Sequence, residues 1–241
     1  MRREVAIAAL AAVAGAAAVL AVPATAQAPV ETTVRIKAKV IPSKAGTPRD
    51  PQGVKIRASA RFFTPDGVEK PIATHGYALL PRAGEWNGGR YPKCDKRTLD
   101  REGPDGCPKR SRIGRATGTV YADNVITKPE IEIFNGGQRL AFAYVTLYHP
   151  ALVQEAIPVR IKKLRRGRWG YRVSLRIPVS LQVVAGVPIA PRSLRGQVGR
   201  GKIITTTSCP RNRRWPYRVK TFFSNGTSHT FDGSVRCRPA R

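Results

Sequence analysis

The feature of this sequence that most constrains its fold is the alternation of apolar and cationic side chains over residues 157–177. A period of two is that of a β-strand, in which successive side chains point to opposite faces of the sheet. The segment therefore predicts a β-hairpin with one apolar face and one cationic face. The apolar face comprises Val159, Ile161, Tyr171, Val173, Leu175 and Ile177, and the cationic face includes Arg160, Lys162, Arg172 and Arg176.

The register of this hairpin is limited to two choices. Both apolar sets must share a face, so paired positions sum to an even number and the turn has an odd length, spanning either 166–168 or 164–168. Lys162 faces Arg172 in the first register, and Arg160 faces Arg172 in the second. Because like charges directly opposite each other destabilise a sheet, this face is either well solvated or neutralised by an anion.

Charge is the strongest compositional signal in the chain. It carries 43 Lys and Arg against 15 Asp and Glu, a formal net charge of +28, and residues 156–231 contain 17 cations and no carboxylate side chain. Two interpretations remain open. The codon usage of a GC-rich genome would give a merely solvated surface, whereas a functional surface would use this field to attract polyanions. Codon usage explains Arg in place of Lys, but it does not explain the missing carboxylates.

Residues 1–26 have the composition of a secretory signal peptide. Two arginines follow Met1, an Ala-rich apolar run spans 5–22, and Ala24-Thr25-Ala26 supplies the small residues of a cleavage site. We expect cleavage after Ala26. An uncleaved anchor is the alternative, which the weak hydrophobicity of Ala disfavours. No later run could span a membrane, so we expect a secreted or cell-envelope-associated protein.

The cysteines predict two disulfides. An exported chain meets an oxidising compartment, and an even number of cysteines follows the signal peptide: Cys94, Cys107, Cys209 and Cys237. Of the three possible connectivities, we favour the nearest-neighbour one, Cys94 with Cys107 and Cys209 with Cys237. A zinc site is disfavoured, because the chain has no C-x-x-C pair and its histidines lack the usual ligand spacing. We expect no metal and no cofactor.

The remaining segments predict an all-β fold. Pro188 and Pro191 are expected to end one of the strands, and turn residues separate several others. No segment after the signal peptide has helical spacing, so residues 27–241 are predicted to form a single antiparallel β-sandwich, Ig-like or jelly-roll-like. Besides the hairpin, the predicted strands are 32–41, 54–63, 72–80, 116–122, 130–134, 139–147, 179–187, 203–208, 217–223 and 229–237, with turns at 64–67, 135–137 and 224–226.

Residues 81–111 interrupt the pattern of strands. They show no periodicity and are rich in Gly, Pro and charged residues. A structureless stretch of this length is unusual inside a compact domain. A disulfide between Cys94 and Cys107 would tie it into a compact flap.

Two stretches resemble uncharacterised secreted proteins of high-GC actinobacteria. The first is Cys107-Pro108, two residues, Ser111, one residue, and Ile113-Gly114, followed by a strand of small residues. The second is the C-terminal part, with Ser208-Cys209-Pro210, Trp215, and Val235-Arg236-Cys237. The resemblance implies secretion and a β-rich fold over residues 79–237, and it implies no activity.

No constellation of residues names a reaction. The chain lacks the GxSxG, HExxH, P-loop and dinucleotide-binding motifs. His75, His149 and His229 fall on or beside predicted strands, where a structural role is expected. Glu130 and Glu132 share one strand face as a glycosidase pair would, but they alternate with isoleucines, which indicates a solvent-facing surface. We therefore expect a protein that is not an enzyme; an unrecognised hydrolase is a remote alternative.

The tryptophans offer one candidate contact with sugars. Trp169 and Trp215 are expected to pack at the edge of the core, beside Tyr171 and the Cys209 bridge. Trp86 stands in a Gly-rich stretch, 84–89, where burial is hard to arrange, and we keep it as a candidate binding residue.

The leading functional hypothesis is an exported, non-catalytic protein that associates electrostatically with anionic polymers of the cell envelope. A phosphate-rich polymer, an anionic lipid surface or extracellular nucleic acid would each serve, because phosphate contact from Arg is not selective by itself. A glycan-binding or adhesive β-sandwich module that uses Trp86 is the alternative. The candidate binding residues are Arg160, Lys162, Lys163, Arg165, Arg166, Arg168, Arg172, Arg176 and Trp86.

Overall fold

The computed structural model describes residues 31–240, and the predicted signal peptide lies outside that range. Among the described residues, 57% are in strands and 8% in helices, and the antiparallel sheets form a nearly closed, barrel-like sandwich. The prediction of an all-β sandwich is confirmed.

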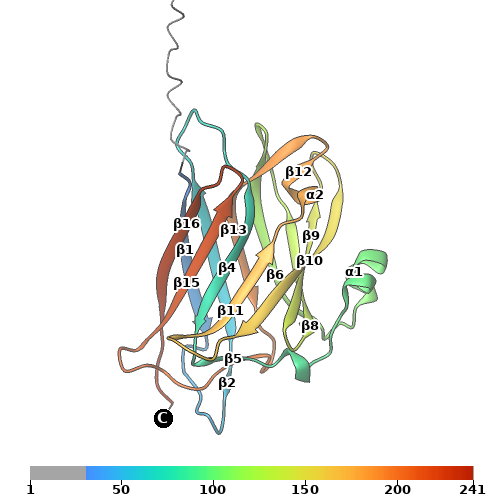
Figure 1. Ribbon diagram of the computed structural model, residues 1–241. Coiled ribbons are helices and arrows are strands. Elements are labelled where there is room, and N and C mark those ends of the chain that lie inside the picture. Colours follow the sequence, from blue (N-terminus) through green and yellow to red (C-terminus); the bar gives the residue numbers. More distant parts are fainter. Residues whose placement is uncertain (1–30, 241) are drawn as a thin grey trace, which may run out of the picture.

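One sheet forms most of the molecule (Figure 1). Within residues 31–240 it has thirteen strands, eleven of which follow one another in a single hydrogen-bonded path. Five of them make the first wall, called here the β1–β8 wall: β1 (Thr33–Ile41), β3 (Lys55–Phe63), β13 (Val187–Val198), β6 (Arg112–Ala122) and β8 (Glu130–Gly137). The other six make the β9–β16 wall: β9 (Leu140–Leu147), β10 (Val153–Lys163), β11 (Trp169–Arg176), β4 (Ala73–Pro81), β15 (Arg214–Phe223) and β16 (Ser228–Arg236).

The alternation seen in the sequence decides which side chains enter the space between the walls. In β1 and β3, Ala38 pairs with Ala58 and Lys39 pairs with Arg57, so the apolar residues share the inner face and the cations share the outer one. The hairpin of β10 and β11 follows the same rule. Lys162 pairs with Arg172, which confirms the register with the turn at 166–168.

The two ends of the path meet at β1 and β16, where side chains join the strands. The backbone N–H of Val34 donates to Nδ1 of His229 over 3.2 Å, and the Tyr217 hydroxyl donates to the carbonyl of Ile36 over 3.4 Å. These contacts bring the edge strands of one sheet together. The sheet therefore comes close to closing on itself, which brings its two edge strands together and makes them less available to other chains.

Smaller elements cover the two ends of the barrel-like sandwich (Figure 1). At one end, a three-stranded sheet runs in the order β2 (Gln52–Gly53), β14 (Ile204–Thr206) and β5 (Gly84–Trp86). At the other end lie the short helix α2 (Val179–Gln182) and strand β12 (Val183–Val184). Leu181 of α2 packs with Val145 and Ile157 in the core, and the Ser180 hydroxyl donates to the carboxylate of Glu155.

The flap predicted at 81–111 contains β5, the helix α1 (Lys96–Glu102) and two single 3-10 turns, η1 (Gly88–Arg90) and η2 (Pro104–Gly106). Leu99 and the disulfide pack on Phe134, Phe142, Tyr144 and Ala156, which point outward from β8, β9 and β10. The flap thus covers an apolar patch on the outside of the sheet.

Both predicted disulfides are confirmed. Cys94 is bonded to Cys107 with Cα atoms 5.4 Å apart, and Cys209 is bonded to Cys237 with Cα atoms 5.8 Å apart. The first ties the flap, and the second joins the segment before β15 to the end of β16. Their presence fits an oxidising compartment.

Asn135 holds the flap against the sheet. Its side chain is fully buried, and its amide nitrogen donates to the carbonyls of Gly88, Tyr91 and Pro92 over 2.9, 3.2 and 2.9 Å. Its side-chain oxygen accepts from the N–H of Gly137 over 3.0 Å. The prediction of a turn at 135–137 is therefore wrong. These residues remain in β8 as a bulge, and the turn comes after Gly137, because the flap uses the Asn side chain.

The strand predicted at 179–187 is also wrong. That segment forms α2, β12 and a tight turn at Ala185-Gly186, where both residues have positive φ angles. The turn starts β13, which runs to Val198 and contains both Pro188 and Pro191. Pro191 is tolerated because the register of β13 shifts just after it, as at a β-bulge.

Helix α1 had no counterpart in the sequence prediction. Its signals are local ones: the Asp95 carboxylate caps the helix by accepting from the N–H of Thr98 over 2.9 Å, and Gly103 ends it with a φ of 68°. Within the helix, only Leu99 is buried, so it has no amphipathic period. None of the helices in residues 31–240 has the length and apolar character needed to cross a lipid bilayer.

We expect Asn135→Ala to lower the free energy of unfolding by at least about 2 kcal/mol, because each buried polar group left unpaired costs about 1–3 kcal/mol. Urea denaturation of the two proteins measures this difference. Asn124→Ala, at an exposed turn, is the matched control and should change stability by no more than about 0.5 kcal/mol. Equal effects of the two substitutions would contradict the role of Asn135.

We expect the double variant Cys94→Ala, Cys107→Ala to lose about 3 kcal/mol of stability, as removal of a cross-link over a loop of this size predicts. Because the flap would lose its tie, limited proteolysis should cut first within 81–111. Mass spectrometry of the early fragments gives the site of cleavage. An unchanged unfolding midpoint together with first cuts elsewhere would show that the flap does not depend on this bond.

Candidate functional site

The predicted hairpin surface exists, and the structure separates its cations into two groups. Arg160, Lys162, Arg172 and Arg176 lie on the outer face of β10 and β11 by register, and all are exposed. Lys163 pairs with Tyr171, so by register it lies on the same face as the apolar side chains, at the end of the hairpin. The remaining predicted cations, Arg165, Arg166 and Arg168, are exposed at the turn.

A neighbouring arginine fixes this turn. The Arg82 side chain donates from Nε to the carbonyl of Gly167 over 2.6 Å and from Nη2 to the carbonyl of Arg165 over 2.8 Å. The guanidinium of Arg168 lies 4.3 Å from the ring centroid of Trp169. The backbone that carries the cations of the turn is therefore held in place by Arg82.

Aromatic side chains lie among the cations on the outer face of the β9–β16 wall. The Arg172 guanidinium lies 4.1 Å from the centroid of the Tyr77 ring, and Lys220 Nζ lies 4.9 Å from that of Phe222. His75 stacks on Phe222 with centroids 4.2 Å apart. Such cation–π contacts orient charged side chains without neutralising them.

One ion pair interrupts the positive charge of this wall. Arg218 donates from Nε and Nη2 to the two carboxylate oxygens of Asp232 over 2.7 and 2.8 Å. These hydrogen bonds hold the pKa of the Asp232 carboxyl below its usual value. Of the ion pairs found within residues 31–240, none includes a cation of the β10–β11 hairpin. The hairpin cations thus form no direct ion pair within the described residues, whereas Arg218 does.

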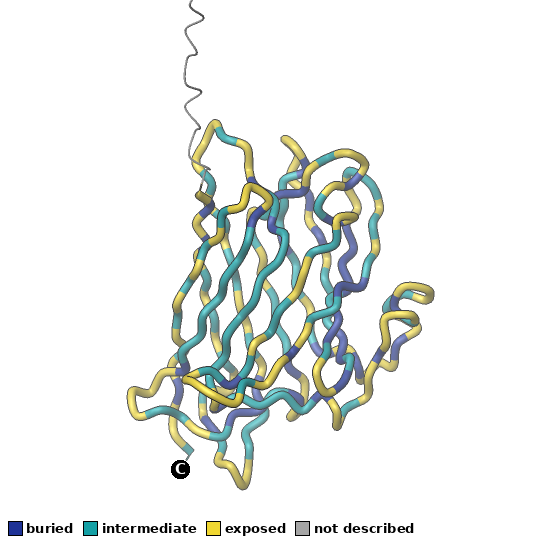
Figure 2. The backbone as a smooth tube through the Cα atoms, in the orientation of Figure 1, coloured by how far each residue is buried: buried dark blue, intermediate teal, exposed yellow. Residues whose placement is uncertain are grey.

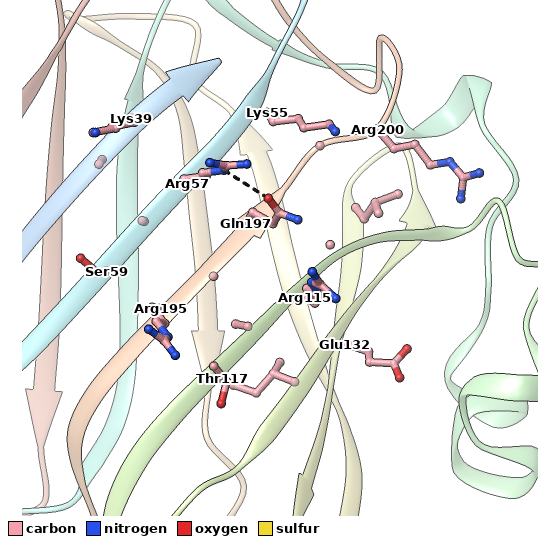
Figure 3. A pocket seen from close by; sticks show the side chains of 18 of the residues that line it. Lys39, Lys55, Arg57, Ser59, Arg115, Thr117, Glu132, Arg195, Gln197 and Arg200 are labelled. Carbon is pink, nitrogen blue, oxygen red and sulfur yellow. Dashed lines mark hydrogen bonds between the residues drawn. The ribbon is translucent and has the colours of Figure 1, made fainter. Parts of the chain in front are cut away.

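A second cationic surface lies on the β1–β8 wall and is hollowed into a groove of about 1240 Å³ (Figure 3). It is called here the cationic groove. Among the residues described, eight Lys and Arg and two Glu line it, together with three neutral polar side chains. The cations are Lys37, Lys39, Lys55, Arg57, Arg112, Arg115, Arg195 and Arg200; the others are Glu130, Glu132, Ser59, Thr117 and Gln197.

Strand pairing sets these side chains in rows across the groove. One row runs Lys39, Arg57, Gln197, Arg115 and Glu132 on five neighbouring strands. The adjacent row, two residues further along each strand, runs Lys37, Ser59, Arg195, Thr117 and Glu130. Figure 3 shows the labelled members of both rows standing side by side, with the Arg57 Nε donating to Gln197 over 3.3 Å. Neutral polar groups thus separate most of the cations.

The two glutamates lie at one side of the groove, and each has a partner. Glu132 Oε2 lies 2.6 Å from Arg112 Nε in an ion pair, although the N–H direction does not meet hydrogen-bond geometry. Glu130 accepts from the Tyr148 hydroxyl over a long 3.5 Å. Their placement on the outer face of β8 agrees with the expected surface position.

The histidines lie apart from one another in the fold. His75 is stacked on Phe222 and lies 3.0 Å from the Thr74 hydroxyl, and His229 accepts from Val34. His149 is exposed at the end of β9. Across residues 31–240, no group of three His, Cys, Asp or Glu side chains is arranged to hold a metal ion.

Trp86 is placed apart from the candidate cations. The expected loop at 84–86 is strand β5, and the Trp86 indole is half-buried, with its N–H donating to the carbonyl of Gly137 over 2.9 Å. Trp215 is buried and donates to the carbonyl of Ser208 over 2.8 Å, as expected for packing beside the Cys209 bridge. Trp86 therefore serves to seat the flap.

The sequence analysis missed the cationic groove as a site. The outward cations of β1 and β3 were visible as alternation, but Arg115 and Arg195 join them only through the strand order β3-β13-β6. That order places residues about eighty positions apart on adjacent strands. No spacing in the sequence signals it.

Comparison with known proteins gives no family for this chain. No family model matches it, and no curated protein matches it. Among solved structures, it is similar to one described as "AvmM Catalyzes Macrocyclization in Alchivemycin A Biosynthesis", with a TM-score of 0.33 and 6% identity over 87% of this chain and 90% of that chain. A similarity this low bears on neither the fold nor the activity of this protein.

Proposed function

We propose that this protein is an exported, non-catalytic protein that associates with anionic polymers of the cell envelope. The observation that carries the proposal is the cationic groove, where eight cations converge around a hollow of about 1240 Å³ that contains only two carboxylates among its described residues. Side chains held this way repel one another unless an anion is present. A polymer with regularly spaced phosphates would neutralise several of them at once.

The partner is a polymer rather than a small anion because the cations extend over a large area. In the groove they come from four neighbouring strands, β1, β3, β13 and β6, and from Arg200 just after β13, and a further set lies on the hairpin of the opposite wall. Arg offers planar, bidentate contact to phosphate oxygens. Many weak contacts of this kind along one chain give a high overall affinity with a steep dependence on salt.

We propose the groove as the main binding site for the polymer and the hairpin surface as a secondary one. The groove is concave, so a bound chain would meet cations from several strands, whereas the hairpin cations lie on the outer face of one wall. The disulfides fit export. The alternative of a glycan-binding module draws no support from Trp86, because its indole N–H and part of its ring are used within the fold.

Charge reversal in the groove tests the proposal. We expect the variant with Lys37, Lys39, Arg57 and Arg195 changed to Glu to bind a soluble polyphosphate at least about tenfold more weakly than the wild type, and the salt dependence of binding to become shallower. Isothermal titration at two or more salt concentrations measures both. Circular dichroism should be unchanged, because these side chains point outward.

Two variants with the same change in net charge serve as controls. In one, Arg160, Lys162, Arg172 and Arg176 of the hairpin become Glu; in the other, Lys93, Arg97, Arg101 and Arg110 of the flap become Glu. The flap variant should bind almost normally. Equal losses in all three would reduce the effect to bulk charge, and no loss in any of them would refute the proposal. If only the hairpin variant lost polyphosphate binding, the binding site would lie on the hairpin surface instead of the groove.

A further inference from the structure

The space between the two walls is hollow at the end closed by β2, β14 and β5. A cavity of about 240 Å³ lies there, and its surface is formed by apolar atoms alone. It is called here the lumen cavity. Both walls and the three-stranded end sheet contribute to it, through residues that include Ile36, Ala38, Ile56, Ala58, Ala78, Leu80, Trp86, Tyr171, Trp215 and Tyr217.

The cavity results from the choice of small side chains at inward positions. Ala38 and Ala58 pair on adjacent strands, and Ala78 faces inward from the opposite wall beside Val173. Eleven strands enclose more space than the eight that side chains alone can fill. Alanines at these positions leave that extra space open.

Solvent accessibility gives independent support for a hollow interior. Leu175 and Leu194 point inward by register and are nevertheless 37% and 39% exposed, so side chains do not fill the interior along its whole length; neither residue lines the lumen cavity itself. Figure 2 shows long half-buried stretches along the strands of both walls. Apolar clusters lie toward both ends, around Leu181 and Ile177 near α2 and around Trp215 near the end sheet. The interior is thus packed at these clusters and incompletely filled between them.

The aromatic residues of the cavity turn their polar atoms away from it. The Tyr217 hydroxyl donates to Ile36, the Trp215 indole to Ser208, and the Trp86 indole to Gly137, all to backbone carbonyls. Each ring therefore presents hydrocarbon to the cavity while its donor is satisfied elsewhere. The surface of the cavity is apolar, which disfavours a charged ligand, although the buried Thr206 hydroxyl in its lining has no hydrogen-bond partner among residues 31–240 and could meet one weakly polar atom.

We propose that the lumen cavity is a binding site for a neutral hydrocarbon group, either a medium-length acyl chain or a small fused aromatic ring. An apolar cavity of about 150 Å³ stays dry and accepts benzene, so this larger one suits a correspondingly larger group. The site differs from the cationic groove in position and in chemistry. It does not depend on the function proposed for the groove.

Titration with 1-octanol and with naphthalene tests the site. We expect at least one of these neutral probes to raise the melting temperature of the full-length exported protein and to change tryptophan fluorescence, because Trp86 and Trp215 line the cavity. Binding should be independent of salt and should persist in the groove variant with four Glu. Octanol binding alone would identify an acyl chain, and naphthalene binding alone an aromatic group.

Filling the cavity provides the decisive comparison. Ala78→Leu should raise the melting temperature and weaken probe binding at least tenfold, because the added atoms occupy empty space. The matched control, Ala143→Leu, places the same atoms beside the packed cluster around Leu181, so it should lower the melting temperature and leave binding intact.

The proposal is overturned if neither probe binds up to its solubility limit, or if Ala78→Leu binds as tightly as the wild type. Equal weakening in both variants would also overturn it. Should Ala78→Leu fail to fold, Ala58→Leu from the opposite wall is judged by the same criteria.

Discussion

The near-closure of one antiparallel sheet on itself is the constraint on which the other features of this structure depend. Once β1 meets β16 through Val34 and His229, and β15 through Tyr217, every strand has a fixed inner and outer face. A period of two then assigns each side chain to the interior or to solvent. Most of the strand cations fall on the outer faces by this rule and gather there; Lys163, at the end of β10, is an exception.

The flap covers one place where that assignment leaves apolar groups outside. Phe134, Phe142 and Tyr144 point outward from β8 and β9, and they would be exposed without Leu99 and the Cys94–Cys107 disulfide above them. The flap also borders the cationic groove, since Arg200 donates to the carbonyl of Lys109 over 3.0 Å. It therefore stands between the groove and the hairpin surface and keeps them distinct.

Local features of the sequence predicted the strands well, and long-range features could not be predicted. Alternation placed β1, β3, β4, β10 and β11 correctly, because each buries one face and solvates the other. The strand β13 was missed because its prolines are accommodated by a bulge, and Asn135 was read as a turn residue because its partners lie in the flap. Predicting the groove requires the strand order, and predicting the lumen cavity requires the packing of side chains between the walls. A single sequence reveals neither.

The uneven composition of the groove has a consequence for where a polyanion can lie on it. The strands β1 and β3 contribute Lys37, Lys39, Lys55 and Arg57, whereas β13 and β6 alternate a cation with Gln197 or Thr117, and β8 presents Glu130 and Glu132. The charge is therefore graded across the wall, from densely positive on β1 and β3 to negative on β8. A bound polymer that shifted toward β8 would exchange cations for carboxylates, so this gradient would hold it on the side of the groove formed by β1 and β3.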